Sequence, residues 1–346
     1  MTRITIVTDA WHPQVNGVVR SIERTNEELL KMGASVEMVT PQGFRTIPMP
    51  TYPEIRLAMA TYRTVSKVIE RSQPSYVHIA TEGPLGVKAR KWCMRHNMPY
   101  TTSYHTRFPE YVSARIPVPE RWLYALVRRF HNAGAGCMVA TDTLAKELSA
   151  RGFKNLMRWS RGIDQDLFRP RPFTESVLDL PRPIFMNVGR VSVEKNIEAF
   201  LELDLPGSKV VVGDGPQRES LAKRFPAVTF TGAKFGQELA RHYASADVFV
   251  FPSRTDTFGN VILEALACGV PVAAYPVMGP LDIIGGSAAG ALDEDLRTAC
   301  LKALGVSREA AREHAMRYSW ASSARQFLTN VQIANGERLA EKSAAE

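Results

Sequence analysis

The chain has 346 residues, of which 45% are apolar and 23% charged, and its net charge at pH 7 is +8. This length allows two domains of ordinary size, and the composition is typical of a globular protein. No apolar run approaches the roughly 20 residues of a membrane-spanning helix, and a strand pattern starts at the N-terminus, so we expect neither a membrane anchor nor a signal peptide. The scattered cysteines indicate reduced thiols in the cytoplasm.

Strand and helix patterns alternate through the first half of the chain. The predicted strands lie at residues 4–8, 35–40, 76–80, 100–103 and 136–140. A helical pattern from about Ser21 to Met32 follows the first strand, and another begins at Thr143 after the last. Strands joined through helices imply right-handed crossovers, so we predict a parallel sheet with ligand-binding loops at the carboxyl ends of its strands.

The second half repeats this alternation after a stretch rich in proline, which blocks regular strand pairing. Its predicted strands lie at residues 184–188, 209–213, 228–230, 248–251 and 270–273. A last helical pattern runs from Tyr318 to about Ala334. We therefore expect a first domain at residues 1–165, a linker at 166–183, a second domain at 184–318, and a C-terminal helix with a frayed tail at 319–346.

Two carboxylates frame the strand–loop–helix segment at residues 248–269. Asp256 lies in the loop, and Glu264 follows a little over two helical turns later. The start of a helix favours a phosphate, whereas carboxylates accept hydrogen bonds from hydroxyls. Together they indicate a ligand with hydroxyls beside its phosphates, such as a nucleotide sugar. The alternative is that Asp256 caps the helix and Glu264 is solvated.

Cations and glycines follow other predicted strands. Arg190 lies at the end of a strand and Lys195 five residues later, so the two can bind one diphosphate, although most Arg and Lys side chains are simply solvated. Gly17 lies where the first strand turns into the first helix and lacks a Cβ that would obstruct a ligand. This turn has no GxGxxG pattern, which disfavours a dinucleotide enzyme.

Three polar side chains end strands of the first domain. His105 follows the strand at residues 100–103 and is expected to face the cleft between the domains; the alternative is a structural histidine. His12 and Glu82 lie on equivalent loops and are candidates for contact with an acceptor.

These segments resemble family 4 glycosyltransferases, which are retaining enzymes of the α/β GT-B fold. The stretch from Asp256 to Glu264, followed by Ala-Leu-Ala-Cys-Gly, looks like the carboxylate-x7-Glu signature, with Asp in place of the usual Glu. The string G-R-x-x-x-E-K-N matches from Gly189 onward. The resemblance implies two Rossmann-like βα domains that face each other across a cleft, with a C-terminal helix that crosses back onto the first domain.

The resemblance also implies roles for individual residues. The catalytic set would be His105, Arg190, Lys195 and Asp256. The donor-binding set would be Gly17, Asp164, Gly213, Gly215, Thr257, Phe258, Gly259 and Glu264. On the acceptor side we place His12, Glu82, Arg107 and Trp122. We expect no metal and no cofactor, because the acidic strings Asp164-Gln-Asp166 and Asp293-Glu-Asp295 lack supporting context; the donor would be a UDP-sugar or a GDP-sugar.

Residues 107–131 interleave arginines with aromatic and aliphatic side chains. The arginines are Arg107, Arg115, Arg121, Arg128 and Arg129. From Pro119 the pattern is helical, with Trp122, Leu123, Leu126 and Phe130 on one side. Such a segment suits an anionic lipid surface, and equally a core-facing helix with a solvated basic face. The chain carries no motif that reads nucleic acid, so we expect no nucleic-acid partner.

The sequence is thus interpreted as a retaining transferase that moves a hexose from a nucleotide sugar to an acceptor hydroxyl. The segments around Asp256 and His105 look most like the branch with plant sulfoquinovosyl-diacylglycerol synthase and bacterial α-mannosyl- and glucuronosyltransferases of glycolipids. That likeness implies a lipid acceptor, such as diacylglycerol or a glycolipid, and peripheral binding to the inner face of the cytoplasmic membrane. The alternatives are a mannosyl- or glucosyltransferase of polysaccharide synthesis and a non-catalytic sugar-binding protein.

Overall fold

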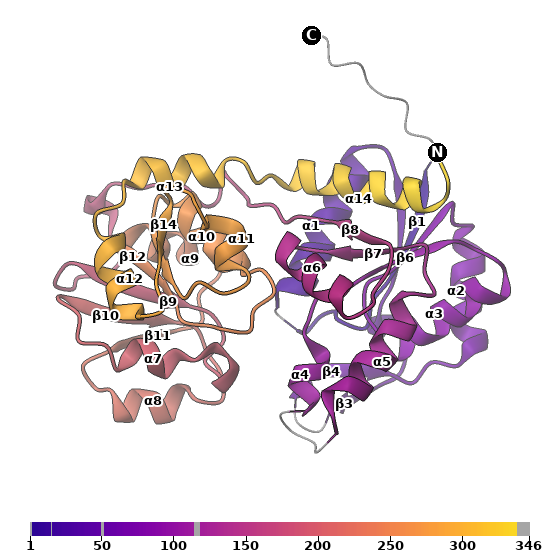
Figure 1. The fold of residues 1–346 in the computed structure, drawn as a ribbon, viewed down its shortest axis with the longest axis horizontal. Helices are drawn as coiled ribbons and strands as arrows, with labels where there is room; N and C mark the ends of the chain where they lie inside the picture. The colour runs from indigo at the N-terminus through magenta and orange to yellow at the C-terminus, as the bar shows by residue number, and fades with distance from the viewer. Residues whose placement is uncertain (1, 15, 50–51, 114–117, 338–346) are drawn as a thin grey trace, which may run out of the picture. The chain divides into compact units, whose positions relative to one another are not determined.

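The structure, a computed structural model, describes residues 2–14, 16–49, 52–113 and 118–337. The chain forms two compact units (Figure 1). Unit 1 comprises the chain up to Arg161 together with the segment that begins at Trp320, and unit 2 comprises Gly162–Ser319. Residues 166–183, where the sequence predicts a linker, belong to unit 2. There Phe168 is buried and its ring lies 5.9 Å from that of Tyr243.

Unit 1 contains a six-stranded parallel sheet in the order β2-β1-β5-β6-β7-β8. Its strands are β1 (Arg3–Val7), β2 (Ser35–Val39), β5 (Tyr76–Ile79), β6 (Tyr100–Ser103), β7 (Gly136–Val139) and β8 (Leu156–Arg158). In register, Ile6 of β1 lies opposite Met38 of β2 and His78 of β5. The strand order reverses between β1 and β5, which is the point where open α/β sheets bind ligands.

Helices cover both faces of this sheet. They are α1 (Gly17–Lys31), α2 (Tyr62–Ser72), α3 (Pro84–Arg95), α4 (Phe108–Ser113), α5 (Glu120–His131), α6 (Asp142–Ala150) and α14 (Trp320–Ala334). Val7 of β1 packs with α2 and α3, whereas Ile4 and Ile6 pack with α1 and α14, as alternation along a strand requires. An antiparallel pair, β3 (Thr46–Met49) and β4 (Tyr52–Ala58), and a 3-10 turn, η1 (Pro41–Gly43), complete the unit.

The C-terminal helix α14 is part of the core of unit 1. Phe327 and Val331 are fully buried there with Trp159 and Ile4. The expected crossing helix therefore packs on the first sheet, after the chain has passed through all of unit 2.

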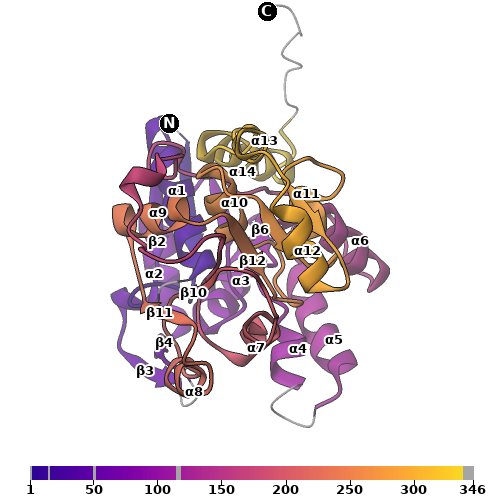
Figure 2. The same ribbon diagram turned by 90° about the vertical axis from the view of Figure 1, so that its left-hand side faces the viewer.

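Unit 2 repeats the architecture with the strand order β11-β10-β9-β12-β13-β14, again all parallel (Figure 2). The strands are β9 (Ile184–Val188), β10 (Ser208–Val212), β11 (Thr229–Gly232), β12 (Val248–Phe251), β13 (Val272–Ala274) and β14 (Gly290–Leu292). The α-helices are α7 (Ile197–Leu201), α8 (Arg218–Arg224), α9 (Gly236–Ser245), α10 (Asn260–Ala267), α11 (Pro280–Ile284), α12 (Leu296–Ala303) and α13 (Arg308–Ala315). The short 3-10 turns are η2 (Phe173–Glu175) and η3 (Val193–Lys195). The predicted α/β class with two parallel-sheet domains is thus confirmed.

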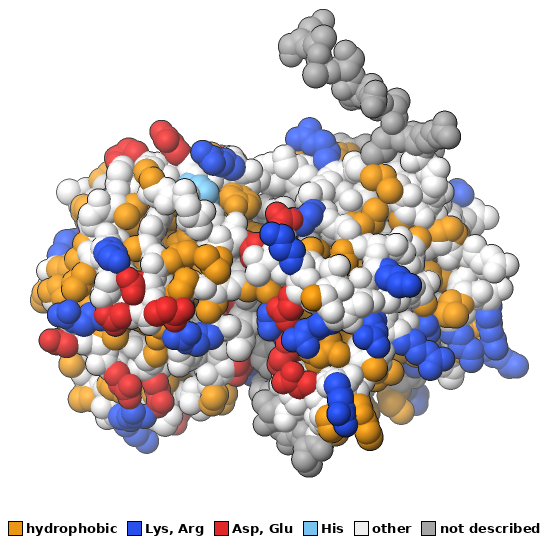
Figure 3. Space-filling view, in the orientation of Figure 1, with side chains coloured by type: hydrophobic (Ala, Val, Ile, Leu, Met, Phe, Trp, Pro, Cys, Tyr) orange, Lys and Arg blue, Asp and Glu red, His pale blue; other side chains and the backbone are white. Residues whose placement is uncertain are grey.

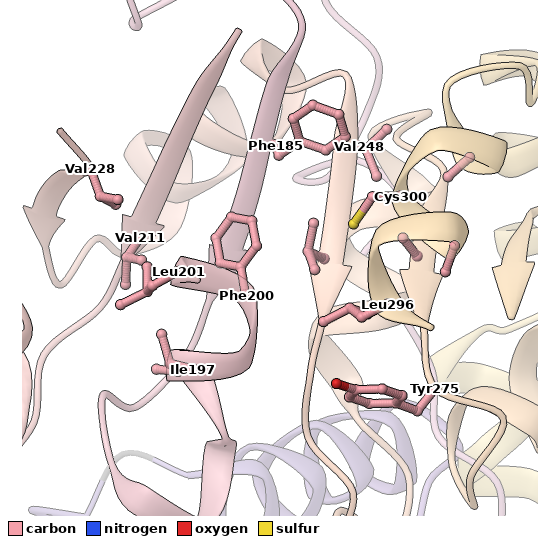
Figure 4. Packing of buried hydrophobic residues seen from close by; sticks show 14 of the residues in the cluster. Phe185, Ile197, Phe200, Leu201, Val211, Val228, Val248, Tyr275, Leu296 and Cys300 are labelled. Carbon is pink, nitrogen blue, oxygen red and sulfur yellow. The ribbon is translucent and has the colours of Figure 1, made fainter. Parts of the chain in front are cut away.

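Alternating residues of β12 define the two faces of this second sheet. Val248 and Val250 pack with α7, α8 and α12 in one cluster, part of which Figure 4 shows around Phe200 and Leu296. Phe249 points to the opposite face, where its ring lies 5.8 Å from that of Tyr243 in α9. A strand with both faces buried reads as a continuous apolar run, which is why it was recognisable in the sequence.

The face of α5 differs from the one expected from its spacing. Trp122 and Leu126 are each 65% exposed, whereas Phe130 is buried with Tyr124 and Val127. A step of four residues advances about 40° beyond a full helical turn, so two such steps carry Phe130 well away from Trp122. Two apolar side chains of α5 therefore remain on the surface.

Candidate functional site

The strongest candidate site lies at the carboxyl ends of β9 and β12 in unit 2. The strand order reverses between these two strands, so the loops that follow them meet at the topological switch point. Nζ of Lys195, in the loop after β9, lies 2.6 Å from Oδ1 of Asp256, in the loop after β12. The side chains are 30% and 18% exposed. The structure thus joins two predicted catalytic residues that are far apart in the sequence.

Further hydrogen bonds fix the two loops against each other. Nδ2 of Asn196 donates to the Pro252 carbonyl at 3.0 Å, and the Thr255 hydroxyl donates to the Glu194 carbonyl at 3.3 Å. Asn196 has a left-handed backbone, with φ of 52°, which Asn tolerates better than most residues. Arg190 opens the first of these loops with an exposed side chain. The loops that carry Lys195 and Asp256 are therefore tied together, and Arg190 lies at the start of the first.

The two carboxylate oxygens of Asp256 differ in their hydrogen bonding. Oδ1 accepts from Lys195, while Oδ2 is buried and has no hydrogen-bond partner within the described ranges. A buried acceptor without a donor costs free energy, so the position favours a ligand that brings a donor. A sugar hydroxyl is such a donor.

Glycines allow the neighbouring loop after β10 to approach the loop after β9. A Cβ on Gly213 would lie 1.8 Å from the Gly189 carbonyl oxygen, and one on Gly215 would lie 2.4 Å from the Val191 carbonyl oxygen. The Val191 amide in turn donates to the Asp214 carbonyl at 2.9 Å. The two glycines are thus needed for backbone-to-backbone packing beside Arg190, whatever they contact in a ligand.

Glu264 is not the solvated helix residue of the alternative interpretation. It is 4% exposed within α10, and its Oε2 accepts from the Tyr243 hydroxyl at 2.9 Å. Phe258 is buried, Thr257 is partly buried, and Gly259 starts α10 from a left-handed conformation, with φ of 94°. The structure therefore fixes the whole 256–264 segment.

His105 in unit 1 has a neighbour that the sequence analysis did not single out. Nη2 of Arg161 lies 3.1 Å from Nδ1 of His105, and the guanidinium stacks over the Trp159 ring at 4.5 Å. Burial, followed by the charges of Arg161, His78 and His131, holds the pKa of His105 well below its ordinary value. His105 is therefore neutral. Arg161 lies three residues before Asp164, a predicted donor-binding residue, and this was the only signal in the sequence that pointed to it.

Glu82 is oriented by a second histidine, His131. His131 is 1% exposed; its Nε2 lies 2.9 Å from Oε1 of Glu82, and its Nδ1 lies 2.8 Å from the Thr102 hydroxyl. Burial opposes charge on this ring, but Cys137 and Glu82 outweigh it and raise the pKa of His131 to about 10. The pair is thus a buried imidazolium with a carboxylate at the carboxyl end of β5, an arrangement that the sequence analysis missed.

The loop after β1 carries two further candidates. Nε2 of His12 lies 2.5 Å from Oε1 of Glu23, and both side chains are partly exposed. Gly17 is exposed at the first position of α1, where Asn16 caps the amides of Val18 and Val19 at 3.0 Å. Both lie beside the switch point of the first sheet.

Other candidates have visible structural roles. Arg107 forms ion pairs with Glu110 at 3.2 Å and Glu147 at 2.5 Å. Asp164 accepts from the Leu167 amide at 3.0 Å in unit 2. Trp122 is exposed on α5, and Arg115 lies outside the described residues.

The acidic string near α12 is likewise occupied by the protein. Asp293 accepts from Lys302 at 2.8 Å, and Asp295 caps α12. Within the described ranges, no group of three or more His, Cys, Asp or Glu side chains is arranged to hold a metal ion. Across the same ranges, the structure contains no helix with the length and apolarity that crossing a membrane requires.

Family models and relatives match both halves of the chain. A model described as Glycosyltransferase Family 4 matches residues 15–167, and one described as Glycosyl transferases group 1 matches residues 182–304. A GDP-mannose-dependent alpha-mannosyltransferase of Mycobacterium tuberculosis is 32% identical over 82% of this chain and 81% of its own length. Sulfoquinovosyl transferase SQD2 of Arabidopsis thaliana is 33% identical over 70% of this chain and 50% of its own length. Alpha-monoglucosyldiacylglycerol synthase of Streptococcus pneumoniae is 30% identical over 87% of this chain and 78% of its own length.

Solved structures share the fold at low sequence identity. A sucrose-phosphate synthase from Thermosynechococcus elongatus matches 97% of this chain and 100% of its own, with a TM-score of 0.77 and 19% identity. HepE from Anabaena, in complex with UDP and glucose, matches 96% of this chain and 100% of its own, with a TM-score of 0.72 and 15% identity. The fold is therefore that of the GT-B glycosyltransferases. Together with the relatives above, it shows that the chain belongs to glycosyltransferase family 4.

Proposed function

We propose that this glycosyltransferase moves a hexose, with retention of the α-configuration, from a nucleoside diphosphate sugar to a hydroxyl of a membrane lipid. The observation that carries the proposal is the contact between Lys195 and Asp256 at the switch point of unit 2, beside the exposed Arg190. Cations suit a diphosphate, and the spare oxygen of Asp256 suits a sugar hydroxyl.

On the donor side, each residue has a distinct task. Arg190 binds two phosphate oxygens through its planar fork, and Lys195 places a point charge on the diphosphate. As the glycosidic bond breaks, negative charge grows on the leaving diphosphate, and these cations stabilise it. The buried Glu264 accepts hydrogen bonds from the ribose hydroxyls, in the orientation set by Tyr243.

The proposed reaction needs no protein nucleophile. The acceptor attacks on the face from which the diphosphate leaves, and a donor phosphate oxygen takes the acceptor's proton. His105 contacts the donor sugar, and Glu82 binds the acceptor hydroxyl through the carboxylate oxygen that His131 leaves available. These roles extend the predictions made from the sequence.

The surface of α3 and α5 supports a lipid acceptor. Trp122 and Leu126 are exposed on α5 next to Arg121 and Arg129, and Val87 of α3 is 51% exposed. Figure 3 shows Lys and Arg side chains beside hydrophobic ones over these two helices. Apolar side chains that enter the headgroup region beside cations that attract anionic lipids suit peripheral binding. One of the relatives above is an alpha-monoglucosyldiacylglycerol synthase, which fits the same acceptor class.

The donor is tested with a thermal-shift panel of UDP- and GDP-sugars. We expect one nucleotide to raise the melting temperature of the wild type and to have no effect on Arg190→Ala. Release of that nucleoside diphosphate should then accelerate when diacylglycerol liposomes are added. Transfer to a soluble oligosaccharide without liposomes would instead support a transferase of polysaccharide synthesis, and stabilisation by no nucleotide would refute the donor assignment.

The lipid surface is tested by reversing two charges on α5. Arg121→Glu with Arg129→Glu should abolish cosedimentation with anionic liposomes, because each cation near the surface contributes about 1 kcal/mol. The matched control is Lys223→Glu, on an exposed position of α8 in unit 2. Equal binding by the double variant and the control would contradict the membrane assignment without affecting the donor assignment.

A further inference from the structure

Arg161 is a buried cation that the proposed chemistry has not yet used. It is 6% exposed, and Nη1 donates to the carbonyls of Trp159 at 2.7 Å and Ser160 at 3.2 Å. Across the described ranges, no carboxylate forms an ion pair with its guanidinium. Burial and the charge of Arg158 lower the pKa of Arg161 to about 9. Burying a guanidinium without a counter-charge costs desolvation free energy, so we expect Arg161 to have a functional role.

The contact with His105 fixes where the imidazole carries its proton. A guanidinium has only donors, so the ring nitrogen that it approaches at 3.1 Å must be an acceptor. That nitrogen is Nδ1 of His105, and a neutral imidazole with an unprotonated Nδ1 is protonated at Nε2. His105 is then a hydrogen-bond donor at Nε2, and neither nitrogen can take up a proton while Arg161 is in place.

The other groups around His105 are consistent with a neutral ring. The Trp159 ring lies 5.6 Å away at an interplanar angle of 63°, which supplies an apolar edge-on contact. The two ring nitrogens of the buried His78 lie 2.8 and 3.0 Å from the hydroxyls of Thr101 and Ser103. Burial is the largest cause of the lowered pKa of His105, and positive charge on Arg161, His78 or His131 disfavours a second proton on it.

We propose that Arg161 is a positioning residue that holds His105 in the neutral tautomer with its proton on Nε2, so that His105 donates a hydrogen bond to the donor sugar and does not act as a base. The consequence for the sugar rests on the proposed function, whereas the tautomer itself does not. Because His105 in this tautomer does not act as a base, the acceptor's proton goes to the phosphate oxygen of the donor.

The tautomer is tested by nitrogen NMR on protein with labelled histidine. The His105 signals are assigned by their loss in His105→Gln. In the wild type we expect an unprotonated Nδ1 and a protonated Nε2 that persist to mildly acidic pH. A wild-type His105 protonated at Nδ1, or doubly protonated near neutral pH, would overturn the proposal without any variant.

Variants of Arg161 separate positioning from packing. Arg161→Met removes the donor, so His105 should sample both tautomers, while burial still holds its pKa below the ordinary value. Arg161→Lys keeps a charged donor and should keep the wild-type tautomer. Trp159→Phe disturbs the same packing but leaves Arg161 in place, and should also keep it. An unchanged tautomer in a folded Arg161→Met variant would refute the proposal.

Kinetics connect the tautomer to the proposed reaction. Arg161→Met should lower kcat for hexose transfer roughly tenfold or more, a typical effect of losing an orienting partner, and Arg161→Lys should recover most of it. The affinity for the nucleoside diphosphate alone should change less than about twofold, because unit 2 binds it. If the wild type transfers no hexose, the proposed function fails while the NMR result still decides the role of Arg161.

Discussion

The carboxyl ends of the two sheets carry candidate sites of different construction. In unit 2 the site consists of two adjacent loops, joined by the contact between Lys195 and Asp256 and by backbone packing at Gly213. In unit 1 the groups come from β5, β6, α5 and the end of β8, and they meet through the buried side chains of His131 and Arg161.

This difference explains which site a sequence reveals. A site built from short loops needs particular residues at fixed spacing, so it leaves a local motif. A site built from buried partners on separate elements leaves scattered single residues, because each partner is set by packing in three dimensions. Changes at the two sites should accordingly act in different ways.

Lys195→Ala should have the largest effect on activity. It removes one charge that stabilises the leaving diphosphate, and such losses typically lower kcat by about 10²–10³-fold. Initial rates of nucleoside diphosphate release measure it. Lys223→Ala, an exposed lysine in the same unit, is the control and should retain the wild-type rate. Full activity in Lys195→Ala would show that the contact between Lys195 and Asp256 has no role in catalysis.

Gly213→Ala should destabilise unit 2 through the contact between its loops. The new Cβ would lie 1.8 Å from the Gly189 carbonyl oxygen, so the backbone must move, at a cost of about 1–3 kcal/mol. Urea unfolding and nucleotide affinity measure the change. Gly236→Ala tests backbone strain alone, because Gly236 also has a positive φ but has open space around its Cβ position. Equal losses in the two variants would rule out loop contact as the cause.

His131 should give unit 1 a stability that depends on pH. Its pKa is raised to about 10, whereas an unfolded histidine titrates near about 6.5. The folded state therefore holds the proton more tightly, and the resulting stability is complete below about pH 6.5 and is lost as pH rises towards 10. Urea unfolding at several pH values should show this decline in the wild type and a flatter profile in His131→Gln and Glu82→Gln. Parallel profiles would show that the pair carries no linked charge.

Tyr243→Phe should act on a single hydrogen bond and leave the backbone of unit 2 in place. It removes one hydrogen bond from the buried Glu264 carboxylate, which costs about 1–3 kcal/mol in the free energy of unfolding. Nucleotide affinity should fall in parallel, because Glu264 loses its orientation. Tyr275→Phe, at another buried tyrosine of unit 2, is the matched control. If Tyr243→Phe lowers the free energy of unfolding but leaves nucleotide affinity unchanged, the orientation of Glu264 has no role in donor binding.

The sequence predicted the regular parts of the fold well. The buried strand β12 is a continuous apolar run, and the predicted limits of β1, β6 and β12 lie within about a residue of the observed ones. The short edge strands β8 and β14 were missed, because three residues are too few to show the alternation of apolar and polar side chains that marks a strand. The β3–β4 pair was missed as well, because prolines at positions 48 and 53 disguise its strands.

The candidate site was predictable only in part. That Lys195 and Asp256 meet follows from strand ends converging at one edge of a parallel sheet, which topology alone requires. The contact between Arg161 and His105 depends on side-chain conformations 56 residues apart, which no local pattern encodes. The catalytic and binding roles assigned from the sequence remain predictions until the variants above are measured.

The position of α14 has a consequence for how the protein is made. Translation completes unit 2 before it reaches Trp320, yet Phe327 and Val331 belong to the core that Ile4 and Trp159 begin. The part synthesised first therefore finishes folding last, with its apolar surface uncovered while the whole of unit 2 emerges from the ribosome. A nascent chain arrested before Trp320 would be a substrate for chaperones, although it already contains every residue assigned here to the chemistry.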